Sequence, residues 1–278
     1  MFERHLDEKA ILRLQNDLLF IERLKPDVQK GEVFPAIRVN RLDFYHKGRE
    51  LFSYDAKGKF STHKKYAAVV RSESSYVSES DLQRNIGLLS FSDPDVYHQI
   101  KENCSLHSGD EAEGVSRIYH KYPFTKNSPP VVVLDIEISF KGEGKKAQDR
   151  VDILLLDKRN GQLRFYEAKH FSNSSLWGSQ RNKMFKQIRD YESQIQKQQA
   201  NIIGQYGNYV RIVKQLFDCN LPNPRTVDNT VPLLVFGFDK DQEKGRLKEL
   251  VLGTKCHYFI GNISRLNIVN MWNKTTCG

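Results

Sequence analysis

The chain has 278 residues, 39% hydrophobic and 28% charged, so it can bury a substantial core as one large domain or two smaller ones. No apolar run approaches the roughly 18 to 20 residues that cross a bilayer, and the first residues lack a signal-peptide pattern, so we expect a cytoplasmic protein. The 43 Lys and Arg against 34 Asp and Glu give a net charge of +9, which favours polyanionic partners without identifying one.

The first third of the chain has a helical pattern followed by a β pattern. Apolar residues at helical spacing predict a helix over residues 6–24 that ends before Pro26. From residue 33 to about 66, alternating segments and turn sequences predict a small antiparallel meander. After the meander, helical patterns resume over 78–103, with a break at 92–94. Its predicted strands cover residues 37–45 and 51–54, and its predicted turns cover residues 46–49 and 55–58.

A polar stretch at residues 106–110 begins a second unit. It divides the chain into an accessory region, 1–105, and a second domain, 106–278, or else marks a joint within one compact domain. The strands of the second unit are apolar on both faces, so we expect helices on both sides of the sheet. The predicted fold class is α/β with an αβββαβ core, preceded by an α+β accessory region. The expected helices cover residues 110–122, 180–217 (with a break at 204–207) and 242–252. The expected strands cover residues 131–140, 150–157, 163–171, 232–238 and 258–263.

The four cysteines are scattered along the chain and form no CxxC pair. This spacing excludes the usual zinc motifs and gives no sign of a disulfide framework. An iron–sulfur cluster built from distant cysteines is the alternative that spacing leaves open. We expect reduced, mainly structural thiols at Cys104, Cys219, Cys256 and Cys277.

Asn160-Gly161 lies between two apolar runs and predicts a hairpin with a two-residue type I′ turn. In that register Asp152 is opposite Lys169, whereas a four-residue loop places Asp152 opposite Glu167. Both registers put the three charged side chains on one face of the sheet. Only a loop of odd length or a bulge would separate them.

These three side chains form a candidate site for metal chemistry. Two carboxylates on apolar strands are costly unless a cation compensates them, and paired acids suit Mg²⁺ or Mn²⁺. A neighbouring ammonium can orient a water molecule or stabilise the charge of a reacting phosphate. The alternative is a structural ion pair in which Lys169 bridges Glu167 and Asp152. Asp149 has the opposite parity and is not a candidate.

Asp152, fourteen further residues and then Glu167-Ala168-Lys169, within an αβββαβ order, resemble the PD-(D/E)XK nuclease superfamily, with its restriction-endonuclease-like core. The resemblance covers roughly residues 108–265, and Val151 stands where proline is usual. It implies that Asp152 and Glu167 bind Mg²⁺ or Mn²⁺ and that Lys169 serves the catalytic water. Residues 1–105 resemble no family, and could select substrate, bind a protein partner or complete the fold.

The helix after the third strand carries Gln187 and Tyr191, one helical turn apart. This spacing resembles the Q-x-x-x-Y element of RecB-type members of the superfamily, which implies a catalytic role for Gln187 at the metal site. The alternative is an ordinary buried stripe with Gln187 solvated beside it. That stripe would consist of Met184, Ile188, Tyr191 and Ile195.

Many superfamily members add an acid from the first helix, and Glu111 shares a helical face with the apolar residues there. Glu111 is therefore our candidate third metal ligand. Two alternatives remain: Ser108 and Glu111 have the spacing of a capping box, and Glu137 on the first strand is a rival ligand. His170 follows the Glu-Ala-Lys triplet with opposite parity and is expected to be packed.

These features predict a metal-dependent deoxyribonuclease acting in phage defence, in a mobile element or in DNA repair. The alternatives are a catalytically silent nucleic-acid-binding module and a ribonuclease on the same scaffold. A homodimer is compatible with cutting two strands, although no sequence feature indicates an interface. Basic residues near the site are candidate phosphate contacts: Lys141, Lys145, Lys146, Arg181, Lys183, Lys186 and Arg189.

Overall fold

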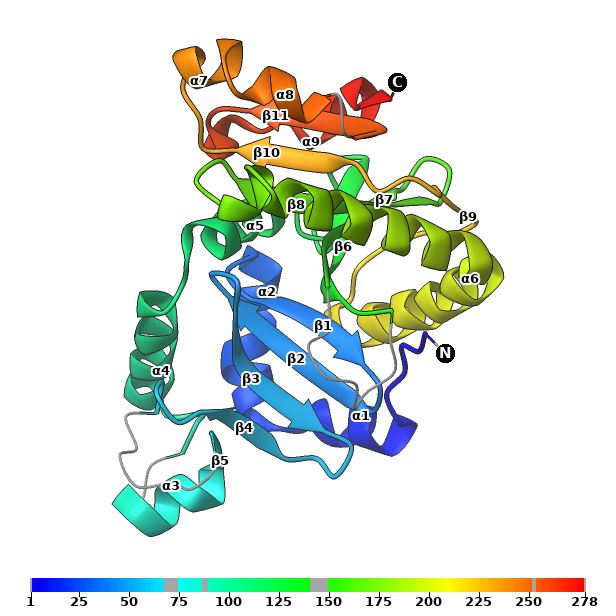
Figure 1. Cartoon of the computed structure of the whole chain (residues 1–278). Helices are drawn as coiled ribbons and strands as arrows, with labels where there is room; N and C mark the ends of the chain where they lie inside the picture. Colours follow the sequence, from blue (N-terminus) through cyan, green and yellow to red (C-terminus); the bar gives the residue numbers. More distant parts are fainter. Residues whose placement is uncertain (1, 68–74, 87–89, 141–149, 252–253, 278) are drawn as a thin grey trace.

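The computed structural model describes residues 2–67, 75–86, 90–140, 150–251 and 254–277. Within these residues the chain forms a five-stranded antiparallel sheet and a seven-stranded mixed sheet, with helices around both (Figure 1). The predicted α/β class is confirmed. Of the helices in this part of the chain, none combines the length and apolarity that crossing a bilayer requires.

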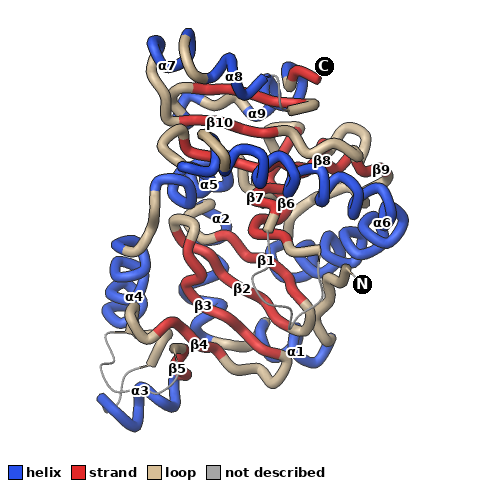
Figure 2. The backbone as a smooth tube through the Cα atoms, viewed as in Figure 1, coloured by secondary structure: helices blue, strands red, loops and turns tan. Residues whose placement is uncertain are grey.

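The five-stranded sheet belongs to the N-terminal region and has the strand order of a meander, as predicted. Its strands are β1 (Phe34–Arg38), β2 (Arg41–His46), β3 (Arg49–Asp55), β4 (Phe60–His63) and β5 (Tyr76–Ser78). The surrounding helices are α1 (Glu8–Leu14), the π-helix η1 (Phe20–Leu24), α2 (Lys25–Lys30), α3 (Glu79–Ile86) and α4 (Pro94–Leu106). Figure 2 shows α4 alongside this sheet and α6 across the mixed sheet.

Two predictions for this region are wrong. The helix predicted over 6–24 is interrupted after α1 ends at Leu14, and it does not end before Pro26: η1 runs directly into α2, whose first turn contains Pro26, a position where proline is tolerated. The strand predicted over residues 37–45 is two strands, joined at Asn40. Asn40 has a left-handed φ of 51°, which asparagine adopts more readily than most residues.

The mixed sheet has the order β12-β11-β10-β8-β7-β6, with β9 paired to β8. Strands β6, β7 and β8 form an antiparallel meander, β10 pairs in parallel with β8, and β11 pairs in parallel with β10. The strands are β6 (Val131–Ile138), β7 (Val151–Asp157), β8 (Gln162–His170), β9 (Thr226–Val227), β10 (Leu233–Phe236), β11 (Cys256–Ile260) and β12 (Thr276–Cys277). The helices are α5 (Asp110–Lys121), η2 (Ser174–Leu176), α6 (Gln180–Phe217), α7 (Lys240–Lys244), α8 (Leu247–Val251), η3 (Ile263–Arg265) and α9 (Ile268–Lys274).

Helices cover both faces of this sheet, as the apolar strands predicted. On one face Phe165 of β8 lies 6.4 Å from Tyr206 of α6, measured between ring centroids. On the other face the hydroxyl of Tyr166 contacts that of Thr275, at the end of α9. Odd-numbered residues of β8 therefore face α6, and this is the face that carries Glu167 and Lys169.

The sequence predictions fail mainly toward the C-terminus. The helix predicted over 242–252 is the two helices α7 and α8, and α9 and β12 were not predicted. Helix α6 departs from helical geometry at Gln198, not at 204–207. The expectation of four reduced cysteines is also wrong, because Cys256 and Cys277 form a disulfide between β11 and β12.

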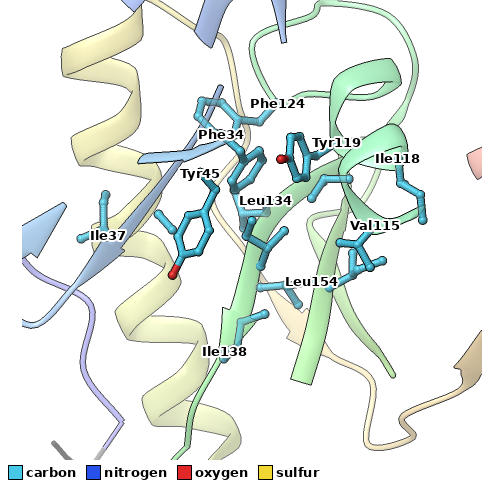
Figure 3. Close-up of a cluster of buried hydrophobic side chains, with 14 of the residues drawn as sticks. Phe34, Ile37, Tyr45, Val115, Ile118, Tyr119, Phe124, Leu134, Ile138 and Leu154 are labelled. Atoms are coloured by element: carbon cyan, nitrogen blue, oxygen red, sulfur yellow. The ribbon is translucent and has the colours of Figure 1, made fainter. Parts of the chain in front are cut away.

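The N-terminal region packs against the mixed sheet through a shared apolar core (Figure 3). Phe34 of β1 lies between Tyr119 of α5 and Phe124, with ring centroids 5.2 and 5.6 Å away. Beside this cluster the fully buried Asp135 of β6 pairs with Arg4 and Arg38. Apolar packing and a buried ion network thus join the two parts of the described chain.

Candidate active site

The β7–β8 hairpin sets the positions of the candidate residues. The pair Asp157 and Gln162 closes the ladder, so residues 158–161 form a four-residue loop and not the predicted two-residue turn. The loop is stabilised by its own contacts, since Gly161 N donates to Asp157 O and Gly161 adopts a φ of +74°. The observed register, the alternative considered from the sequence, runs to the pair Ile153 and Tyr166, and its continuation puts Asp152 opposite Glu167 on one face.

The ammonium of Lys169 is the centre of the cluster. Its Nζ lies 2.9 Å from Glu167 Oε1, 3.0 Å from Glu111 Oε1 and 3.5 Å from Asp152 Oδ2. Glu167 and Lys169 are buried, with 1% and 9% of their surface exposed. The structure therefore brings together, from α5, β7 and β8, the four charged residues that the sequence singled out.

Glu111 does not form the capping box that was its alternative role. The N-cap of α5 is Gly109, which caps with no side chain, and the Ser108 hydroxyl donates to the carbonyl of Lys47. The second oxygen of Glu111 instead accepts a hydrogen bond of 2.7 Å from Nδ2 of Asn173. The sequence did not predict a role for Asn173, because this residue lies in a loop after β8, where no strand or helix periodicity indicates which way a side chain points.

The acids are held in an environment that disfavours their charge. Burial, followed by the charge of Glu167, raises the pKa of Asp152 well above its ordinary value. Burial also raises the pKa of Glu167, against the opposing effect of Lys169. For Lys169 burial acts to lower the pKa, but the three carboxylates outweigh it and raise the pKa well above its ordinary value. The lysine is therefore a protonated donor.

The donor set suits a divalent cation in charge and chemistry. Three carboxylates surround one ammonium, which leaves a surplus of negative charge when all are ionised. The buried Oε2 of Glu167 has no hydrogen-bond partner among the described residues, an arrangement that a hard cation would relieve. In the described part of the chain no three His, Cys, Asp or Glu side chains are already arranged as ligands. Lys169 lies between the carboxylates, so binding would require its flexible side chain to shift.

A pocket of about 320 Å³ opens onto this cluster and includes Asp152 and Glu111 in its wall. Glu137, the rival ligand, also lines it, and its carboxylate lies 3.6 Å from Nη1 of Arg150. Arg49 of β3 reaches the same pocket from the N-terminal sheet, a contribution that the sequence could not reveal. Both Glu111 and Glu137 therefore remain candidates for a third acidic ligand, and only Glu111 contacts Lys169 directly.

Among the described residues, Gln187 contacts Tyr191 and none of the four charged side chains of the cluster. Its Nε2 donates to the hydroxyl of Tyr191, and Gln187 is not among the residues that line the pocket. The alternative stripe of Met184, Ile188, Tyr191 and Ile195 is buried on α6. His170 packs on Phe236, as expected, although it is only half-buried and also lines the pocket.

The candidate phosphate contacts have mixed outcomes. Lys141, Lys145 and Lys146 lie outside the described residues. On α6, Arg181 is partly exposed, and three side chains are exposed: Lys183, Lys186 and Arg189.

The Glu111 carboxylate can be tested against a neighbour on the same helix. We expect Glu111→Gln to weaken Mn²⁺ binding about tenfold, because one charge is lost while the amide oxygen can still contact Asn173. Glu113→Gln is the matched control, since Glu113 pairs with Arg117 at 2.8 Å on the exposed side of α5. Calorimetric titration of both variants gives the comparison, and equal Mn²⁺ affinities would exclude Glu111 as a ligand.

A larger pocket, of about 890 Å³, lies elsewhere, between residues of α4 and α5. Its Lys101 is neutralised by Asp27 and Glu32, with both oxygens 2.6 Å from Nζ. None of the predicted catalytic residues lines it. The smaller acidic pocket is therefore the stronger candidate for chemistry, despite its size.

Comparisons with protein-family models, curated proteins and solved structures return no match to this chain. The geometry of the acidic cluster is therefore the basis on which a function can be assigned.

Proposed function

We propose that this protein is a Mg²⁺- or Mn²⁺-dependent deoxyribonuclease with a restriction-endonuclease-like core. One observation carries the proposal: Glu111, Asp152 and Glu167, from three different elements, converge on the ammonium of Lys169 at the wall of a pocket. Such a cluster is costly for folding, because the carboxylates are held where their charge is disfavoured. Charged groups whose pKa is strongly shifted and that lie in a pocket are the usual candidates for a functional site.

Each residue has a distinct role in this proposal. Asp152 and Glu167 hold the cation, and Glu111 supplies a further oxygen or positions Lys169. A bound divalent cation would polarise the scissile phosphate and lower the pKa of a water molecule. The protonated Lys169 donates to the attacking water or to a phosphate oxygen, and its charge opposes the negative charge that develops on phosphorus. Attack of the water oxygen on phosphorus breaks the bond to the leaving sugar oxygen. The attacking water gives its proton to an ionised carboxylate of the cluster or to solvent, and the leaving oxygen takes up a proton from solvent.

The charge of the chain supports a nucleic-acid substrate. The net charge is +9 although the site itself is acidic, so basic residues must predominate elsewhere. Arg49 lines the pocket, Arg150 lies 3.6 Å from Glu137 at its edge, and the exposed basic residues of α6 follow β8 in the chain. Contacts of this kind position a phosphate backbone without reading its sequence.

A cleavage assay tests the proposal directly. The purified full chain with Mn²⁺ is expected to cut at least one of linear, nicked, supercoiled or single-stranded DNA, with no cutting in EDTA. Asp152→Ala is expected to lose at least about a thousandfold in rate, because metal binding and charge compensation fail together. Labelled RNA in the same reaction tests the ribonuclease alternative, and we expect the RNA to remain uncut. If no DNA form is cut and Asp152→Ala behaves like the wild type, the proposal is wrong.

The second candidate function is a catalytically silent nucleic-acid-binding module. One observation favours it: Lys169 already lies within 3.5 Å of three carboxylates, as a structural ion network would hold it. In that case Mn²⁺ would give no binding heat with the wild type. Under our proposal the wild type binds Mn²⁺ and Glu167→Ala does not, so one titration separates the two.

A further inference from the structure

A second pocket, of about 480 Å³, adjoins the acidic one and shares Arg49, Ala112 and Glu137 with it. The two are held side by side by the tip of the β2–β3 hairpin, which presses on α5. Gly48 at this tip has a φ of +77°, and a Cβ there would lie 2.4 Å from the carbonyl oxygen of Ala112. The N-terminal sheet thus contributes to the walls of both neighbouring pockets, and the acidic one contains Asp152.

Aromatic rings line the far side of this second pocket. His63 lies 5.4 Å from Tyr66 and 5.5 Å from Tyr76, between ring centroids. Tyr66 lies 5.7 Å from His107. Tyr76 is 44% exposed, so part of its large aromatic side chain faces solvent beside the pocket.

The pocket also carries positive charge beside these rings. Arg49, Lys65 and Arg150 line it, against the two acids Glu50 and Glu137. Burial, followed by the charge of Asp43, raises the pKa of Glu50 to about 7, so this carboxyl contributes less than a full negative charge near neutral pH. Cations beside aromatic faces are the combination by which proteins hold single-stranded nucleic acid.

We propose that this pocket is a subsite for an unpaired nucleotide of a single-stranded DNA segment. The base lies against Tyr76 and His63, Arg49 and Lys65 contact the adjacent phosphates, and the neighbouring phosphodiester enters the acidic pocket. The inference rests on the proposed nuclease function and deepens it by naming the substrate class. It also gives the N-terminal region a role in substrate selection.

Binding is measured separately from cleavage, with a fluorescent thymidine oligonucleotide and the full chain in EDTA. Tyr76→Ala is expected to weaken single-strand binding about tenfold, whereas Tyr76→Phe, which keeps the ring, should bind like the wild type. Lys65→Ala should weaken binding and reduce its salt dependence. Lys57→Ala is the matched control, because Lys57 is exposed in the turn at the opposite end of β3.

The outcomes distinguish this inference from the function on which it rests. Equal single-strand affinities for Tyr76→Ala and the wild type would overturn the subsite, even if the enzyme cuts DNA. A Tyr76-dependent affinity in a protein that cuts nothing would support the subsite and reject the nuclease. Tighter binding of duplex than of single strand, or of RNA than of DNA, would also overturn it. A melting temperature for each variant confirms that loss of binding is not loss of folding.

Discussion

Asp152→Asn and Glu167→Gln are expected to lower the rate of DNA cleavage at least about a thousandfold while the fold becomes more stable. The loss follows because each amide removes one of the negative charges proposed to hold the cation. The gain follows because burial disfavours the ionised form of both carboxyls in the folded state. We expect about 1 kcal/mol of added stability near pH 8, a size typical of relieved strain at functional sites.

The sign of the pH dependence supports this expectation. Because the pKa of Asp152 is raised by folding, the folded chain holds its proton at pH values where the unfolded chain has lost it. Between pH 3.8, the ordinary pKa of an aspartate, and the raised pKa of Asp152, the contribution of this group to the free energy of unfolding falls as pH rises. Asparagine does not titrate, so Asp152→Asn should be more stable than the wild type at pH 8, and the difference should shrink toward pH 5.

Thermal unfolding at both pH values, with and without Mn²⁺, measures these effects. Mn²⁺ at a hundred times its Kd should stabilise the wild type by about 2.7 kcal/mol and leave the two amide variants nearly unchanged. Glu113→Gln serves as the control for loss of a carboxylate outside the cluster. Amide variants that unfold at lower temperature than the wild type at pH 8 would show that the acids are structural partners of Lys169.

The sequence predicted the site better than its surroundings, for a geometric reason. Side chains alternate along a strand, so any hairpin with an even loop places Asp152 with Glu167 and Lys169, whichever turn forms. The turn itself was predicted wrongly, because Asn-Gly favours a two-residue loop while Gly161 here ends a four-residue one. The error changed the partner of Asp152 and left its face unchanged.

Contacts between distant segments could not be predicted in this way. Asn173 and Arg49 reach the site from a loop and from another sheet, and the disulfide depends on how β11 meets β12. Periodicity describes one element at a time, and these contacts depend on how elements dock. For the same reason the role of Asp135 could not be predicted, since the sequence shows it only as one of two acidic residues within an apolar strand.

Asp135→Ala is expected to destabilise the chain by about 3–5 kcal/mol, the usual cost of removing one partner of a buried ion network. Asp135 is fully buried, with Oδ1 lying 2.9 Å from Arg38 Nη1 and Oδ2 lying 3.1 Å from Arg4 Nε. The Tyr206 hydroxyl also donates to it, at 2.9 Å. Alanine would leave two nearly buried guanidinium groups without this carboxylate, at the junction of the N-terminal region with β6 and α6. Urea unfolding gives the change in free energy.

The same experiment decides whether the N-terminal region completes the fold. Both tryptophans, Trp177 and Trp272, lie in the second unit, so their fluorescence reports that unit, whereas circular dichroism reports the whole chain. Coincident transitions that shift together in Asp135→Ala would show one cooperative structure, because loss of the junction then destabilises both parts equally. Arg117→Ala is the control: its pair with Glu113 is as short as 2.8 Å but exposed on both sides, and its loss should cost at most about 1 kcal/mol. If Asp135→Ala costs no more than this control, the network does not hold the two parts together, and the apolar cluster around Phe34 must do so alone.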